Sequence, residues 1–93
     1  VGFSISEIDD FIGLLQLKRA ELLSVNSPGE KDAIYETLKT AISYLENSDE
    51  SAEFNKALDM FLTLDKNKDR DDYKKIKAIS IKHKEIIKKY SNK

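Results

Sequence analysis

The chain has 93 residues, enough for one domain built around a single hydrophobic core. Hydrophobic residues make up 40% and charged residues 35%, a balance typical of a helical bundle with charged outer faces. The lack of Cys excludes disulfides, zinc–thiolate sites, iron–sulfur clusters and thiol redox chemistry. No apolar run approaches the ~20 residues that a membrane span needs, and no signal peptide is visible, so we expect a cytoplasmic protein.

The net charge of −1 conceals an uneven distribution along the chain. From Val1 to Asp72, eight Lys and Arg stand against 16 Asp and Glu, a balance of −8. From Tyr73 to Lys93, eight Lys stand against one Glu, a balance of +7. The two parts can attract one another within the fold, or the basic end can face an acidic partner.

The predicted elements are all helical. One Pro and three Gly leave few breaks, which favours long helices over a turn-rich β fold. Apolar residues recur at helical spacing in four stretches and predict helices over residues 4–25, 28–46, 51–64 and 71–90. We therefore predict an all-α fold that forms a single domain over residues 1–93. Because short connections favour antiparallel neighbours, this domain should be a small antiparallel bundle of about four helices.

The first two predicted helices start with the same signal. Ser4 and Glu7 form a capping box, and Ser27, Pro28 and Glu30 repeat the pattern. The first predicted helix has helical apolar spacing with two partly apolar faces. In these two helices, the residues expected to form the packing and dimer face are Ile8, Phe11, Ile12, Leu15, Leu38, Ile42 and Leu45.

The last predicted helix has the most distinctive pattern. At 100° per residue, one arc carries Ile76, Ile79, His83, Ile86, Ile87 and Tyr90. The opposite arc forms a basic face of Lys74, Lys75, Lys77, Lys82, Lys84, Lys88 and Lys89. This face is either a solvated surface that balances the acidic remainder of the bundle, or a surface for an acidic protein or an anionic membrane. No Arg and no aromatic residue lies among these Lys residues, so we expect no direct sequence-specific nucleic-acid contact.

No catalytic or metal-binding pattern is present. His83 is the only His, so it lacks a partner for a triad or a zinc site, and we expect a buried or half-buried ring with one hydrogen bond. Residues 65–69 open like a calcium loop, but Arg70 and Ile76 stand where the Gly and the bidentate Glu belong. We therefore expect no enzyme activity, no cofactor and no bound metal. The four Tyr rings are expected at core edges with their hydroxyls in water: Tyr35, Tyr44, Tyr73 and Tyr90.

The run Gly2-Phe3-Ser4-Ile5-Ser6-Glu7-Ile8-Asp9-Asp10-Phe11-Ile12 resembles a phrase common in the mercury-resistance-regulator (MerR) family of bacterial transcription factors. In that family it lies near the end of a winged-helix DNA-binding domain and precedes a long helix that pairs two protomers as an antiparallel coiled coil. The stretch from Leu38 to Leu45 is similar to the end of such a helix, whereas Pro28 and Gly29 interrupt it. The resemblance implies a regulatory and dimerisation domain with a small-molecule or protein input, and places the DNA-reading elements upstream of Val1.

A second resemblance concerns architecture alone. Bacteriocin immunity proteins are similar in length, form antiparallel four-helix bundles and protect a cell from its own peptide toxin. This resemblance implies a stand-alone interaction module that uses the basic face against a protein partner or a membrane surface. The first interpretation predicts a homodimer, and the second predicts a monomer whose binding is sensitive to salt.

Overall fold

The computed structural model describes residues 2–48, 50–64 and 70–91 of the chain. In this part of the chain there are four helices and no strand, which confirms the predicted all-α class. The helices are α1 (Ile5–Asn26), α2 (Lys31–Leu45), α3 (Ser51–Leu64) and α4 (Asp71–Ser91).

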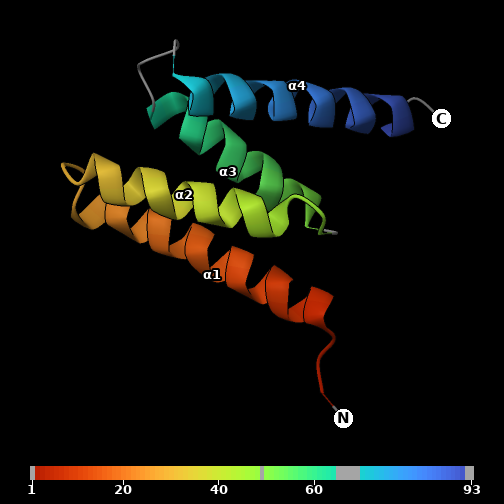
Figure 1. The fold of residues 1–93 in the computed structure, drawn as a ribbon, viewed down its shortest axis with the longest axis horizontal. Helices are drawn as coiled ribbons and strands as arrows, with labels where there is room; N and C mark the ends of the chain where they lie inside the picture. The colour runs from red at the N-terminus through yellow and green to blue at the C-terminus, as the bar shows by residue number, and fades with distance from the viewer. Residues whose placement is uncertain (1, 49, 65–69, 92–93) are drawn as a thin grey trace.

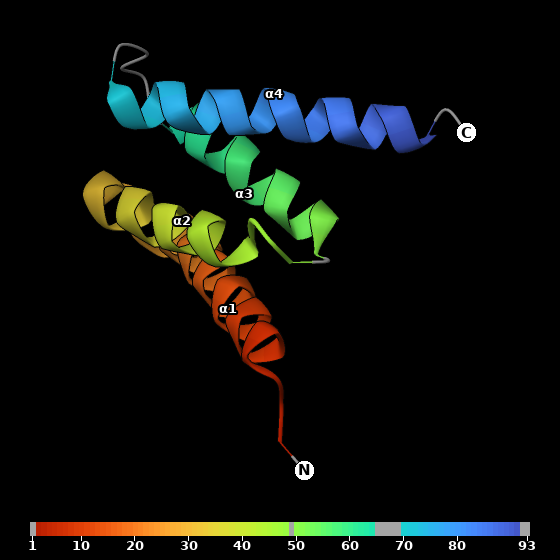
Figure 2. The same ribbon diagram turned by 45° about the vertical axis from the view of Figure 1, so that its right-hand side comes forward.

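Successive helices run in opposite directions, as Figure 1 shows. α1 packs on α2, α2 on α3 and α3 on α4, with a smaller contact between α1 and α3. Among the described residues, no Cα atom of α4 comes within 8 Å of α1 or α2. The four helices therefore form an open antiparallel stack, and α4 continues past the start of α3 (Figures 1 and 2).

The two predicted helix starts differ in outcome. Ser4 caps α1, because its Oγ accepts a hydrogen bond from the Glu7 amide at 3.1 Å and donates to the Glu7 carboxylate at 3.2 Å. The second capping box was wrong, since α2 begins at Lys31 and Glu30, its N-cap residue, makes no side-chain cap bond. Instead, the Glu30 amide donates to the Ser27 carbonyl at 3.0 Å, so this segment forms the turn that reverses the chain.

The buried core is built mainly by α2 and α3. Its apolar members are Leu17, Ala20, Ile34, Tyr35, Leu38, Ala41, Ile42, Leu45, Phe54, Ala57, Leu58, Phe61 and Ile76. Tyr35 was expected at the edge but is only 6% exposed, because its ring packs on Phe61 with the centroids 4.5 Å apart. From α4, only Ile76 is fully part of this core.

The inner side of α1 combines two small residues with one large one. Gly13, Leu17 and Ala20 are buried against the bundle and lie on one side of the helix at spacings of four and three residues. A Cβ atom built on Gly13 would lie 2.7 Å from the Cγ atom of Leu45, so the two helices approach too closely there for a larger residue. Leu17 fills the core on this side, whereas Phe11 and Leu15 lie on the exposed side of the helix.

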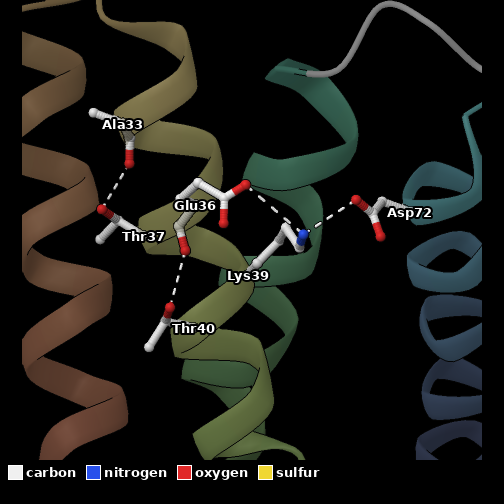
Figure 3. Close-up of polar contacts among 6 residues, drawn as sticks. All are labelled: Ala33, Glu36, Thr37, Lys39, Thr40 and Asp72. Atoms are coloured by element: carbon white, nitrogen blue, oxygen red, sulfur yellow. Dashed lines mark hydrogen bonds and ion pairs between the residues drawn. The ribbon is translucent and has the colours of Figure 1, made fainter.

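A lysine in α2 links the central helix to α4. The Lys39 ammonium lies 3.1 Å from the Asp72 carboxylate and 3.8 Å from that of Glu36, between the two helices (Figure 3). Two residues before Lys39 in the same helix, the Thr37 side chain is buried. Its hydroxyl donates to the Ala33 carbonyl at 2.7 Å, so this polar group has a hydrogen-bond partner within α2 (Figure 3). Exposed ion pairs of this kind contribute little free energy, so Lys39 mainly fixes the position at which α4 starts.

Candidate interaction surfaces

The residues expected to form the packing and dimer face divide between two environments. The three from α2 are all within the core of the protomer: Leu38, Ile42 and Leu45. Of the four from α1, Ile12 is half-buried, while three are 45–67% exposed: Ile8, Phe11 and Leu15. The α2 residues therefore act in intramolecular packing, and only those of α1 remain accessible to a partner.

The exposed side of α1 carries a row of apolar residues, which we call the outer stripe: Phe3, Ile8, Phe11, Leu15 and Leu22. Phe3 precedes the helix but belongs to the stripe, because its ring packs edge-on against Phe11 with the centroids 5.4 Å apart. A large apolar side chain has about 150–250 Å² of surface when fully exposed, and these five are 45–67% exposed, so together they present roughly 500 Å². That area lies in the upper part of the range for the largest patch on a monomer, about 300–600 Å², and such patches commonly mark interaction sites.

Charge changes sign along α1. The first half of the helix carries Glu7, Asp9 and Asp10 and no basic residue, whereas Lys18 and Arg19 follow in the second half. Lys18 is exposed beside the outer stripe and lies 3.9 Å from Glu21, a weak contact across one turn. α1 therefore has an acidic N-terminal half and a more basic C-terminal half. Of the acidic residues, Glu7 borders the stripe, whereas Asp9 and Asp10 line a hollow on the side that faces α2.

The basic face of α4 is exposed along its whole length. Its six principal members are all exposed: Lys74, Lys77, Lys82, Lys84, Lys88 and Lys89. Of these six, Lys84 alone has an ion pair within the described part of the chain, at 3.4 Å from Asp59. Among these six lysines, one direct ion pair therefore offsets the negative charge of the remaining bundle, and the ammonium groups of the other five face solvent.

The isoleucine arc of α4 is covered by the bundle over only part of its length. Ile76 is buried and Ile79 is half-buried. The next residue, Ser80, is also buried, although the sequence pattern did not single it out. Beyond His83 every described side chain is exposed. We call the uncovered apolar residues of these last turns the terminal arc: Ile86, Ile87 and Tyr90.

His83 lies at the last position along α4 that the bundle still partly buries. Its ring is half-buried, its Nε2 atom lies 3.2 Å from the Ser51 hydroxyl, and it meets the Phe54 ring edge-on with the centroids 4.9 Å apart. These contacts confirm the prediction of a half-buried ring with one hydrogen bond. They assign His83 to the junction of α3 and α4.

A groove on the described surface lies between α2 and α3. Its volume is about 460 Å³, and its charged lining residues are Lys31 and Asp59. Within the described residues, no three His, Asp or Glu side chains are close enough to hold a metal ion. Residues 65–69, which open like a calcium loop, lie outside the described part of the chain.

Of the described helices, none combines the length and apolar character that crossing a bilayer requires. In comparisons with known protein families, with curated proteins and with solved structures, no match to this chain is found.

Proposed function

We propose that this chain is a non-catalytic helical domain that associates with a second copy of itself through the outer stripe of α1. The observation that carries the proposal is the position of the large apolar residues of α1, with Phe11 and Leu15 on the side that faces away from the bundle. A monomer gains nothing from keeping such residues in water, whereas a partner that covers them removes apolar surface at about 25 cal/mol per Å².

This role agrees with the resemblance of the first residues to a family of dimeric regulators. We propose that the domain serves as the dimerisation or regulatory part of a bacterial transcription regulator. In such a protein, helix-to-helix association joins two protomers, and the bundle passes a signal between its input and the attached DNA-binding part. The α2 residues of the predicted face contribute to this association only indirectly, because they form the core of the protomer against which α1 packs.

A stand-alone interaction module, such as a bacteriocin immunity protein, is the second candidate function. It is favoured by the basic face of α4, where five of the six principal lysines have no ion pair within the described residues. An acidic protein or an anionic membrane surface would be the counterpart of this face.

Sedimentation equilibrium over a wide range of protein concentration tests the first candidate. We expect the natural chain to dimerise and Phe11→Asp to be monomeric, because the substitution puts a charge into the apolar contact. Ile81→Asp is the matched control: Ile81 is an equally exposed apolar residue on the lysine-bearing side of α4, and this variant should dimerise normally.

Far-ultraviolet circular dichroism verifies that both variants keep the helical fold. A natural chain that stays monomeric at all concentrations would exclude self-association and leave the interaction module as the better candidate. Equal dimerisation of the natural chain and Phe11→Asp would show that α1 is not the contact surface.

A further inference from the structure

We infer that the outer stripe of α1 is received by the terminal half of α4 in the second copy, so that two copies exchange α1–α4 contacts reciprocally. This inference rests on the proposed self-association and names the surface that the stripe contacts. It goes beyond the dimer helix implied by the sequence resemblance, in which α1 would meet its own counterpart.

The first argument is that the protomer leaves two amphipathic faces uncovered. One is the outer stripe, and the other is the terminal arc of α4, whose members Ile86 and Ile87 are 44% and 40% exposed. Figures 1 and 2 agree that α4 runs on past the beginning of α3 and that the first turns of α1 diverge from α2. The terminal arc therefore lies on a helix end that projects from the stack, and the outer stripe begins on another, at the first turns of α1, where a helix of another copy can reach it.

The second argument is charge complementarity. The N-terminal half of α1 bears Glu7, Asp9 and Asp10 without any basic residue, a balance of −3. In α4 from residue 81 to 90, four Lys residues stand against Glu85, a balance of +3. Glu7 lies one turn before Phe11 and borders the outer stripe, so an α1–α4 contact brings this carboxylate toward the lysines. Asp9 and Asp10 lie on the side of α1 that faces α2, where they line a hollow with Tyr44, and they contribute to the negative charge of this end of the helix. A contact between two α4 ends would instead bring the lysines against one another.

The lysines also have the right placement on the helix. Lys82 and Lys89 border the terminal arc on one side and Lys84 borders it on the other, while Lys88 lies farther round the helix beside Ile81. Apolar residues at the centre with charges at the rim is the usual arrangement of a protein–protein contact. A planar membrane is a poorer match, because the terminal arc continues the side of α4 that carries Ile76 and faces α3, so the bundle itself obstructs a flat surface.

The third argument is area. The terminal arc adds roughly 300 Å² to the roughly 500 Å² of the outer stripe, so two copies together have at most about 1,600 Å² of exposed apolar surface on these faces. A reciprocal contact covers the part of the stripe that the shorter arc can reach, and it removes both kinds of face from water in the same dimer. Pairing the two outer stripes alone covers at most about 1,000 Å², at the low end of the range for specific interfaces, and leaves both terminal arcs in water.

The natural chain has no Cys, so single Cys residues introduced into it can be cross-linked without background. We would mix a tagged Phe11→Cys chain with an untagged Ile87→Cys chain and treat the mixture with a short bismaleimide. The expected product is the mixed cross-linked dimer. Ile81→Cys, on the other side of α4, replaces Ile87→Cys in the control mixture, which should give at most the low yield of random collision.

The outcomes separate this inference from the proposed function. If Phe11→Cys or Leu15→Cys cross-links to itself and the mixture with Ile87→Cys gives no mixed product, two α1 helices meet, the inference is overturned and self-association stands. If the natural chain is monomeric in sedimentation, the proposed function fails and the inference fails with it.

Charge reversal gives an independent check on the dissociation constant of the dimer. Lys82→Glu with Lys89→Glu should raise this constant about tenfold at low salt, because two attractive contacts become repulsive. Lys74→Glu with Lys77→Glu makes the same change in net charge on the first half of α4 and should alter it less than twofold. Equal effects of the two pairs would show that only total charge matters and would overturn the inference.

Discussion

Gly13→Ala is expected to destabilise the fold by about 2 kcal/mol, although Ala is the better helix former. In the interior of an exposed helix, replacing Gly by Ala stabilises by about 1 kcal/mol. At Gly13, however, the new Cβ atom would lie 2.7 Å from the Cγ atom and 2.8 Å from the Cδ2 atom of Leu45, and 3.2 Å from the Cβ atom of Tyr44. Neither neighbour gives way easily, because the Leu45 side chain is fully buried and the Tyr44 atom is fixed to the α2 backbone.

The magnitude follows from two opposing effects. Overpacking a well-filled core by one methyl group costs about 1–3 kcal/mol. The upper end applies here, since the contact atom in Leu45 is the branch carbon of a fully buried side chain. Subtracting the helix-propensity gain leaves about 2 kcal/mol, which lowers the urea midpoint of a domain of this size by roughly 1–2 M.

Urea titration followed by circular dichroism measures this change. Gly29→Ala is the control: a Cβ at Gly29 meets nothing within 4 Å and its φ is not positive, so that variant should be neutral or slightly stabilised. Combining Gly13→Ala with Leu45→Ala should cost about 1 kcal/mol less than the sum of the single changes, because the added methyl partly fills the cavity. A Gly13→Ala variant as stable as the natural chain would show that α1 moves away from α2 without cost.

Three further predictions concern the contacts between helices. Glu21 lies 2.6 Å from the Lys56 ammonium, and its hydrogen bond and charge raise the pKa of Lys56 above 10.5. This pair therefore stabilises the fold below pH 10.5 and ceases to do so as the pH rises through the higher folded pKa. As the pH is raised past 10.5, the natural chain should lose more stability in urea titrations than Lys56→Met. His83→Ala should cost about 1–2 kcal/mol in the same assay, because it removes a hydrogen bond and an edge-to-face ring contact, and no loss would contradict the described α3–α4 junction. In hydrogen exchange of dilute protein, the amides of α4 should exchange faster than those of α2, and equal protection would mean that α4 opens only with the whole domain.

The helices were predictable where local signals and long-range packing agree. For α3, regular apolar spacing between two polar stretches indicated residues 51–64, and the structure has Ser51–Leu64. The start of α2 was not predictable in the same way. Ser27 and Pro28 are good residues for a helix start, but the chain must reverse direction there, and the turn occupies them. Local capping signals cannot include that geometric requirement.

The outer stripe shows what a pattern of apolar residues leaves open. Two apolar sides of α1 were visible in the sequence, and the side with the larger residues, Phe11 and Leu15, was the natural choice for packing. The bundle instead uses the side with Gly13 and Ala20, since small residues allow α1 to approach α2 closely. Which side faces inward depends on the shape of the neighbouring helix, and the spacing of apolar residues contains no information about that shape.

The weak attachment of α4 links the proposed dimer to local stability. Only Ile76 of this helix is fully in the apolar core. Ile79 is half-buried against the core and Ser80 is buried, and beyond them the contacts with the stack are the His83 junction and two ion pairs between partly exposed side chains. A reciprocal α1–α4 contact would bury apolar side chains in the last turns of α4, where the protomer itself buries none of the described side chains. Protection of α4 amides should then rise with protein concentration while that of α2 stays constant, whereas a dimer of two α1 helices would leave α4 exchange independent of concentration.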